Sequence, residues 1–197
     1  TNARGLSLDN VTQAEVVNSG TIAATAVVEP SFSYAEAGSF SDLDPADEIA
    51  AVFASGSTGS SLDLTNTGDI SGAFSVVSYS FDNKITNSGT MTGDMIFNYC
   101  AIDVEIENTQ TGLIDGDIYV GAVGTFNDSA TARIVNRGEI DGSFFLADGN
   151  DTYVSDAGAV LNGDINMDGG NDFFDSSNGG VVLGQINLGS GNDTIRI

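Results

Sequence analysis

The stretch "RIVNRGEIDGSFFLA", residues 133–147, alternates apolar and polar side chains along most of its length. Its residues Ile134, Ile140, Phe144 and Leu146 are separated by even numbers of positions, so an extended chain places them on one face. Most residues between them are charged, polar or glycine. The pattern predicts β-strands with one buried face and one face in water.

Two motifs within this stretch recur along the chain. The motif apolar-x-Asn-x-Gly places Asn18, Asn66, Asn87 and Asn136, and Asn108 begins a copy whose glycine is delayed to Gly112. The motif apolar-x-Gly-x-apolar-x-apolar follows it, and a degenerate first copy spans residues 22–28. Its six clear copies contain Gly72, Gly93, Gly116, Gly142, Gly163 and Gly184, which are 21, 23, 26, 21 and 21 residues apart.

A unit of this length cannot bury its apolar face alone, so successive units must stack. We therefore predict an all-β fold, a right-handed parallel β-helix (β-solenoid) with about 21 residues per coil and roughly seven coils. Asn66, Asn87 and Asn108 should form a ladder of amide hydrogen bonds, and glycine and asparagine should mark bends that need positive φ. The stacked apolar column should contain Ile70, Met91, Ile114, Ile140, Leu161 and Val182.

The repeat is interrupted near the N-terminus. Residues 29–61 contain both prolines and are interpreted as an insertion that projects from a single solenoid domain, 1–197, itself a fragment of a longer chain. Asp44 and Pro45 are typical of a helix start, which predicts a short helix at about 45–54. A shorter interruption, residues 121–132, predicts a surface loop. Insertions of this kind are candidate partner-binding sites.

Charge limits the classes of partner. The chain has 5 basic and 28 acidic residues, a net charge of −23, which disfavours binding to nucleic acid or to anionic membrane surfaces. It favours divalent cations or cationic partners. The single cysteine, Cys100, excludes an intrachain disulfide and is interpreted as a small buried apolar residue. No apolar run long enough for a transmembrane helix and no N-terminal signal pattern are present.

Three Gly-rich turns repeat with the same period. "DGND", "DGGND" and "GSGND" end at Asp151, Asp172 and Asp193, each 21 residues after the last. Stacked carboxylates about 4.8 Å apart repel one another unless a cation lies between them, and calcium prefers such oxygen ligands. The same residues also suit metal-free turns. The candidate calcium ligands are Asp148, Asp151, Asp168, Asp172, Asp193, Asn171 and Asn192.

The sequence gives little support for catalysis. Without histidine, no Ser-His-Asp or Cys-His arrangement and no histidine metal ligand is possible. A pair of carboxylates that hydrolyses polysaccharide remains the open catalytic alternative. The five basic residues do not suggest a substrate clamp, and we interpret Arg133 and Arg137 as partners of nearby acids.

Units such as "ITNSGTMTGDM" (85–95) and "AVLNGDINMDGGNDFF" (159–174) resemble the passenger repeats of bacterial autotransporters, specifically acidic passengers with hemolysin-type Gly-Asn-Asp turns. The resemblance covers about 62–197 well and 16–28 weakly. It implies export through the outer membrane and an extracellular or cell-surface location, without direct membrane insertion of this segment. Two departures are the lack of a C-terminal barrel in this sequence and the restriction of calcium-type turns to the last three units.

These observations lead to a first hypothesis, a secreted or cell-surface structural or adhesive β-solenoid that is not an enzyme and is stiffened by calcium. Its partners would be a cell-surface or matrix component, or other copies bound end to end. The alternatives are a calcium-dependent surface-layer or filament subunit and a polysaccharide-processing enzyme.

Overall fold

The structure, a computed structural model, describes residues 5–25, 50–56, 58–97, 101–121 and 129–197. Every regular element in these ranges is a β-strand, and every strand pairing is parallel. The predicted all-β, parallel architecture is therefore confirmed. None of the described residues belongs to a helix that is long and apolar enough to cross a membrane.

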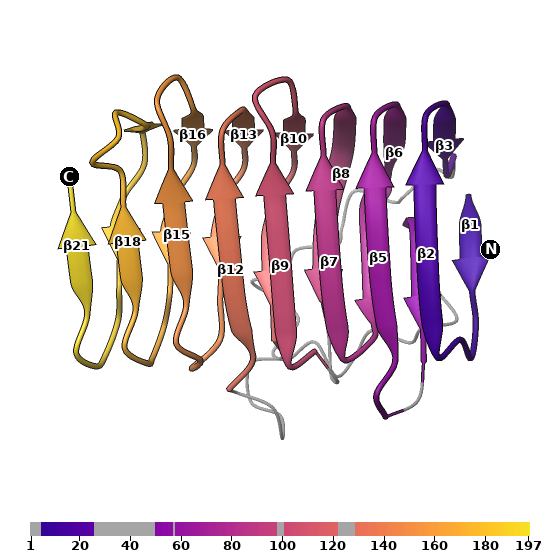
Figure 1. The fold of residues 1–197 in the computed structure, drawn as a ribbon, viewed down its shortest axis with the longest axis horizontal. Helices are drawn as coiled ribbons and strands as arrows, with labels where there is room; N and C mark the ends of the chain where they lie inside the picture. The colour runs from indigo at the N-terminus through magenta and orange to yellow at the C-terminus, as the bar shows by residue number, and fades with distance from the viewer. Residues whose placement is uncertain (1–4, 26–49, 57, 98–100, 122–128) are drawn as a thin grey trace.

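One sheet has eight strands, which lie side by side in the foreground of Figure 1, and we call it the front sheet. Each strand pairs with the strand one repeat later, and the two chain ends lie at opposite ends of the row. In sheet order the strands are β2 (Gln13–Asn18), β5 (Ser61–Asn66), β7 (Asp82–Asn87), β9 (Asp103–Asn108), β12 (Thr131–Asn136), β15 (Thr152–Ser155), β18 (Phe173–Asp175) and β21 (Thr194–Arg196).

The second sheet has thirteen strands and two arms, which the long strands β6 (Asp69–Tyr79) and β8 (Thr90–Phe97) join; we call it the curled sheet. The first arm also contains β3 (Thr21–Ala23), β10 (Leu113–Asp115), β13 (Glu139–Asp141), β16 (Val160–Asn162) and β19 (Val181–Val182). The second arm also contains β1 (Leu6–Leu8), β4 (Ala50–Ser55), β11 (Ile118–Val120), β14 (Phe144–Phe145), β17 (Ile165–Asn166) and β20 (Ile186–Asn187).

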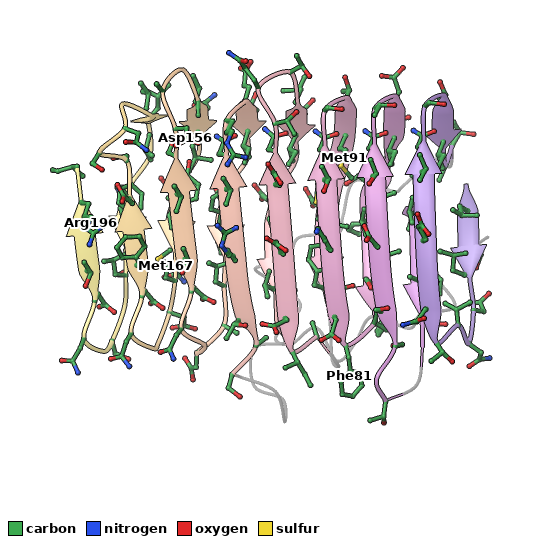
Figure 2. The ribbon with its side chains drawn as sticks, viewed as in Figure 1. Phe81, Met91, Asp156, Met167 and Arg196 are labelled. Carbon is green, nitrogen blue, oxygen red and sulfur yellow. The ribbon has the colours of Figure 1, made fainter. Side chains whose placement is uncertain are left out.

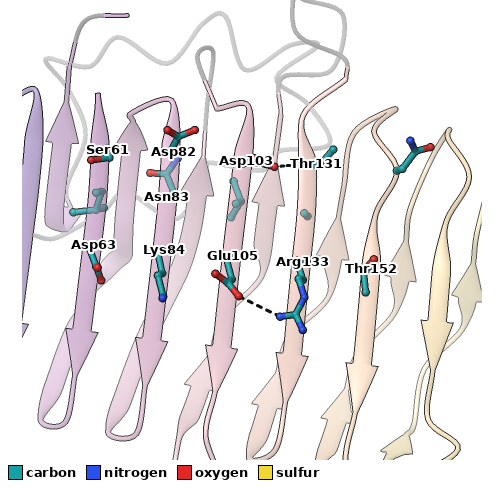
Figure 3. Close-up of a pocket in the computed structure, with 14 residues that line it drawn as sticks. Ser61, Asp63, Asp82, Asn83, Lys84, Asp103, Glu105, Thr131, Arg133 and Thr152 are labelled. Carbon is teal, nitrogen blue, oxygen red and sulfur yellow. Dashed lines mark hydrogen bonds and ion pairs between the residues drawn. The ribbon is translucent and has the colours of Figure 1, made fainter. Parts of the chain in front are cut away.

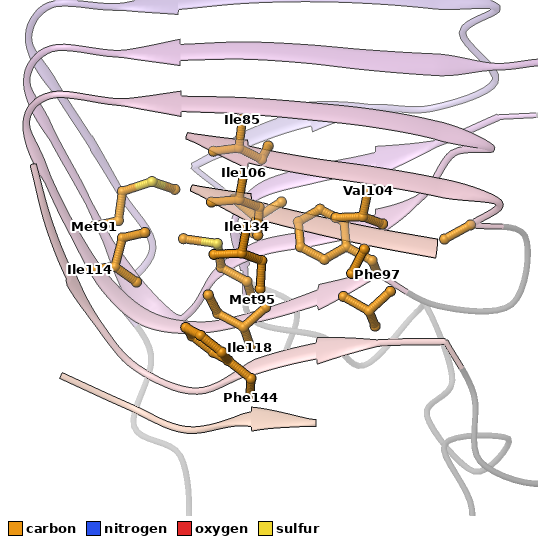
Figure 4. Packing of buried hydrophobic residues seen from close by; sticks show 14 of the residues in the cluster. Ile85, Met91, Met95, Phe97, Val104, Ile106, Ile114, Ile118, Ile134 and Phe144 are labelled. Carbon is orange, nitrogen blue, oxygen red and sulfur yellow. The ribbon is translucent and has the colours of Figure 1, made fainter. Parts of the chain in front are cut away.

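The main core is built from apolar columns that run from repeat to repeat (Figures 2 and 4). The predicted column is confirmed, because Ile70, Met91, Ile114, Ile140, Leu161 and Val182 are successive strand partners. A second column contains Leu64, Ile85, Ile106, Ile134, Tyr153 and Phe174. Burial of each such side chain contributes roughly 1.5–3 kcal/mol.

The amide ladder is also confirmed, and it is longer than predicted. The Nδ2 group of Asn66 donates to Oδ1 of Asn87 at 2.9 Å, and Asn87 donates to Asn108 at 3.0 Å. Asn18 and Asn136 extend the ladder at its two ends, with bonds of 2.8 and 3.1 Å. At the next repeat the register position is occupied by Ser155, so the amide ladder ends at β12.

The predicted positive φ is confirmed at only some of the repeated glycines. Gly93 and Gly116 have positive φ values of 105° and 157°, whereas Gly142, Gly163 and Gly184 do not have a positive φ. These three are required because neighbouring repeats approach closely: a Cβ atom on Gly142 would lie 2.0 Å from the carbonyl oxygen of Gly116. Contacts of 2.1 and 2.0 Å would occur at Gly163 and Gly184 with the glycine one repeat earlier.

The helix prediction for about 45–54 is wrong over its described part. Residues 50–54 belong to strand β4, which pairs with β1 and with β6. Val52 and Ala54 pack into the main core, whereas Ala50 and Phe53 pack into a second apolar cluster with Val77. A strand that is buried on both faces has a continuous run of apolar residues. The spacing of apolar residues does not distinguish such a strand from a buried helix. The start of the predicted helix, Cys100 and most of the 121–132 loop lie outside the described residues.

Candidate functional site: the stacked acidic turns

The three Gly-Asn-Asp turns lie at the N-terminal ends of the front-sheet strands β15, β18 and β21, and their row forms one edge of the stack. Thr152, Phe173 and Thr194 are successive strand partners, so the aspartates that precede them share one register position. A bridge between Gly169 and Ser190 joins the second and third turns. The structure therefore brings Asp151, Asp172 and Asp193 together in a column, as predicted.

These aspartates form a carboxylate ladder. Oδ1 of Asp151 accepts the backbone N–H of Ala132 at 2.7 Å. Oδ1 of Asp172 accepts the N–H of Asp151 at 2.8 Å, and Oδ1 of Asp193 accepts the N–H of Asp172 at 3.0 Å. Each carboxylate thus accepts a backbone N–H of the repeat before it, where a backbone carbonyl would otherwise be the acceptor.

The asparagines of the same turns bond in the opposite direction. Oδ1 of Asn150 accepts the N–H of Asn171 at 2.7 Å, and Oδ1 of Asn171 accepts the N–H of Asn192 at 3.0 Å. These side chains are exposed, whereas Asp151 and Asp172 are only 1% and 2% exposed. Each turn is therefore joined to its neighbours from the inside by aspartate and from the outside by asparagine.

The predicted calcium ligands do not all converge. Asp148 and Asp168 are exposed, as are Asn171 and Asn192. Asp148 lies against the backbone one repeat later, since a Cβ on Gly169 would be 2.7 Å from its Oδ1. Within the described ranges, no three acidic side chains are grouped as metal ligands would be.

Two oxygens in the ladder nevertheless lack a partner. Oδ2 of Asp151 and Oδ2 of Asp172 are buried and accept no hydrogen bond in the structure. The hydroxyls of Tyr153 and Ser155, on the strand that follows Asp151, are also buried without a well-formed hydrogen bond. A buried carboxylate oxygen without a partner costs free energy unless it binds a proton or a cation.

Proton binding is favoured at this position. Burial raises the pKa of Asp151 to about 8; the N–H of Ala132 lowers it, and the nearby charge of Asp172 raises it further. Burial also raises the pKa of Asp172, although the hydrogen bond from Asp151 acts in the opposite direction. Near neutral pH, a pKa of about 8 favours the protonated form of the Asp151 carboxyl.

Acidification should consequently stabilise this part of the fold. A folded pKa of about 8 for Asp151 lies above the unfolded value of about 3.9, so its contribution is fully present below about pH 4 and is lost as the pH rises towards 8. In the absence of divalent metal, we expect the free energy of unfolding to be about 3–4 kcal/mol higher at about pH 5 than at about pH 8, because each pH unit between the two pKa values changes it by about 1.4 kcal/mol.

Urea denaturation at the two pH values measures this difference. Asp151→Asn, which keeps an oxygen for the N–H of Ala132, should remove most of it, whereas Asp148→Asn at an exposed position should preserve it. An unchanged pH dependence in Asp151→Asn would show that another group is responsible.

A second corner ladder was missed by sequence reasoning. Oδ1 of Asp94 accepts the N–H of Asp117 at 2.9 Å, and Oδ1 of Asp117 accepts the N–H of Ser143 at 2.7 Å. Oγ of Ser143 and Oδ1 of Asp164 continue the pattern to Gln185. The sequence position of these residues could have predicted this ladder. Each of them directly follows the repeated glycine of its unit, and most carry a side-chain oxygen suited to a turn.

The outer face of the front sheet has a shallow hollow of about 610 Å³ over the starts of five repeats (Figure 3). One outward row alternates in charge, from Asp63 through Lys84 and Glu105 to Arg133, and Arg133 pairs with Glu105 at 3.2 Å. Arg137 pairs with Glu107 and, at 2.9 Å, with Asp156. The interpretation of Arg133 and Arg137 as partners of nearby acids is therefore confirmed.

Comparisons with family models, with curated proteins and with solved structures found no match, so the contacts between repeats are the basis for any statement about function.

Proposed function

We propose that this chain is a right-handed β-solenoid of about 21 residues per coil and roughly seven coils, with a structural or adhesive role outside the cell. The observation that carries the proposal is the way each repeat is joined to the next. Besides the parallel strands, side-chain ladders run along the corners: amides from Asn18 to Asn136, carboxylates from Asp151 to Asp193, and mixed oxygens from Asp94 to Gln185.

In these ladders, the side-chain hydrogen bonds join one repeat to the next. The amide ladder is a buried network whose side chains are hydrogen-bonded from repeat to repeat, and such networks rigidify a structure and specify its register. A stack of this kind holds its outer faces at fixed spacing, which suits a spacer or an adhesive surface. The resemblance to autotransporter passengers, which is a resemblance of sequence only, supports an extracellular or cell-surface location and a non-enzymatic role.

Localisation and adhesion can be tested together. Antibodies against the chain should label intact cells of the source organism, and beads coated with the chain should adhere to those cells or to one another more than albumin-coated beads do. Labelling only after permeabilisation, together with no adhesion above the albumin control, would contradict the proposal. Release of products from a panel of polysaccharides would favour the enzymatic alternative, for which the charged hollow of the front sheet is the candidate surface.

We further propose that calcium binds at the edge formed by the acidic turns. The unpartnered Oδ2 atoms of Asp151 and Asp172 support this proposal, because carboxylate oxygens are the ligands that calcium prefers. Two side-chain oxygens do not complete a shell of six to eight, so backbone carbonyls of the glycine turns would supply most of the remainder. When bound, the ion would supply positive charge that holds the carboxylates in their ionised form.

Calcium should raise the melting temperature by several degrees relative to chelator, because a saturating ligand stabilises by about 3 kcal/mol at 100 times its Kd. The increase should be larger at about pH 8 than at about pH 5, since calcium and the Asp151 proton compete. Asp151→Asn with Asp172→Asn should remove the increase, and Asp63→Asn in the front-sheet hollow should not. Equal melting temperatures with calcium and with chelator would rule out this site.

A further inference from the structure

Phe145 is a large apolar side chain that an inner repeat presents to solvent. It is 41% exposed, although its strand β14 has a paired strand on each side, β11 and β17. Its exposure therefore does not depend on where the stack ends. Phe144, the preceding residue, is fully buried in the main core (Figure 4), so the alternation of side chains along a strand places Phe145 on the outer face of the second arm.

One side of the Phe145 ring is already occupied. The ring of Tyr119, its strand partner one repeat earlier, stacks on it with the ring centroids 4.9 Å apart and the planes 8° from parallel. The strand partner on the other side is Asn166, whose side chain is smaller and has no ring. We therefore place the open face of the Phe145 ring on the side of Asn166.

Carboxylates border this aromatic pair. The hydroxyl of Tyr119 donates to Oδ2 of Asp117 at 3.1 Å, which shows that the residue two positions before the ring lies on the same outer face. Asp164 has the same relation to Asn166 and belongs to the same corner ladder. Its side chain is exposed, and strand spacing places its Cα about 8 Å from that of Phe145. The open face of the ring is therefore close to an exposed carboxylate.

The basic residues that the structure describes lie elsewhere. Each belongs to a front-sheet strand or directly follows one: Lys84, Arg133, Arg137 and Arg196. Within the described ranges, the outer face of the second arm therefore has aromatic rings and carboxylates but no positive side chain. Both kinds of group attract a cation, the ring through its quadrupole and the carboxylate through its charge.

The front sheet shows how such a ring is completed by a cation. The guanidinium carbon of Arg196 lies 5.0 Å from the centroid of the Phe173 ring, and the same guanidinium pairs with Asp175 at 3.7 Å. Phe173 and Asp175 are two positions apart in β18, and Arg196 comes from the next repeat. At Phe145 a ring and a carboxylate are also present, but no described residue supplies the guanidinium.

We propose that Phe145 and Asp164 form a binding site for an arginine side chain of a different polypeptide, whose guanidinium stacks on the open ring face and pairs with the carboxylate. A guanidinium fits because it is planar, stacks on aromatic rings and pairs with carboxylates. A second copy of this chain is a poor partner, because each described arginine is already paired with an acid. The inference rests on the proposed adhesive role and deepens it by naming the chemistry of the partner.

The test uses the full chain and a fluorescent pentapeptide in which arginine alternates with glycine. Two further peptides carry lysine or citrulline in place of arginine; citrulline keeps the shape of arginine without its charge. Fluorescence anisotropy at about 0.15 M salt, where distant charges are screened, should show saturable binding of the arginine peptide. The lysine peptide should bind about threefold more weakly, and the citrulline peptide should not bind.

Substitutions in the chain locate the site. Phe145→Leu should weaken binding of the arginine peptide about threefold to fivefold, and Asp164→Asn should weaken it by a similar factor. Two matched controls should leave binding unchanged. Phe173→Leu removes a ring that already holds Arg196, and Asp63→Asn removes an exposed carboxylate of the front sheet.

An NMR titration of the unmodified chain with the arginine peptide gives a second readout. The backbone amide signals of Phe145 and Asn166 should shift, and those of β7 and β9 should not. Equal binding of the citrulline peptide, equal losses in Phe145→Leu and Phe173→Leu, or a dimer that Phe145→Leu abolishes would each overturn the inference. Peptide binding without bead adhesion would contradict only the adhesive role, whereas bead adhesion without peptide binding would overturn only the arginine site.

Discussion

Gly142→Ala should destabilise the chain by about 3 kcal/mol or more, because the added methyl group has no space and the backbone around it cannot move independently. The new Cβ atom would lie 2.0 Å from the carbonyl oxygen of Gly116 and 3.0 Å from the backbone nitrogen of Asp117. Both atoms are held by the strands on either side, since β11 pairs with β8 and with β14. Relief therefore requires two repeats to separate.

Gly20 supplies the matched control for this substitution. A Cβ atom there would meet no atom within 4 Å, and its φ is not positive, so Gly20→Ala should change stability by less than about 0.5 kcal/mol. Chemical denaturation of the two variants measures the difference. If Gly142→Ala were as stable as Gly20→Ala, the close approach of repeats at the glycine column would be wrong.

Asn87→Ala should have a comparable effect, about 3–5 kcal/mol, because it breaks a buried network and leaves several groups without partners. Asn87 is fully buried and lies in the middle of the amide ladder. Its Nδ2 group donates to Asn108 and to the carbonyls of Gly89 and Leu113. Its Oδ1 atom accepts from Asn66 and from the N–H of Gly89.

A substitution at the neighbouring residue of the same strand distinguishes the contribution of the amide ladder from that of the strand pairing. Thr86→Ala, on the outward face of β7, should cost less than about 1 kcal/mol. Asn87→Asp preserves the shape but replaces donors with a buried charge, so it should be at least as destabilising as Asn87→Ala near neutral pH. A small effect of Asn87→Ala would mean that the backbone pairing alone holds the repeats in register.

The period and the alternation of the sequence were sufficient to predict the columns and the amide ladder. A side-chain period of two sets which residues face inward, and a repeat of constant length sets which residues become neighbours. The pairing of Ile140 with Leu161 and the bond from Asn66 to Asn87 both follow from these two regularities. The same reasoning placed Asp151, Asp172 and Asp193 in one column.

The features that the sequence did not reveal depend on the backbone path and the side-chain burial within a single repeat. The sequence did not show that Oδ1 of Asp151, Asp172 and Asp193 each accepts a backbone N–H from the repeat before it, because these bonds depend on the local path of the glycine turn. The pKa of Asp151 follows from the burial that results. The local sequence signals before β4 predicted a helix, but residues 50–54 instead pair as a strand with β1 and β6. Both partners are distant in the sequence, so the local signals did not reveal these pairings.

The position of the chain ends has a mechanical consequence. Because the two ends lie at opposite ends of the row of strands, tension applied between them acts along the stack and peels repeats one at a time. Resistance should be unequal along the way, since β2, β5, β7, β9 and β12 each have 6 residues in the front sheet, whereas β18 and β21 have 3. Under tension, the repeats with acidic turns should therefore unfold first, and the repeats joined by the amide ladder should unfold last.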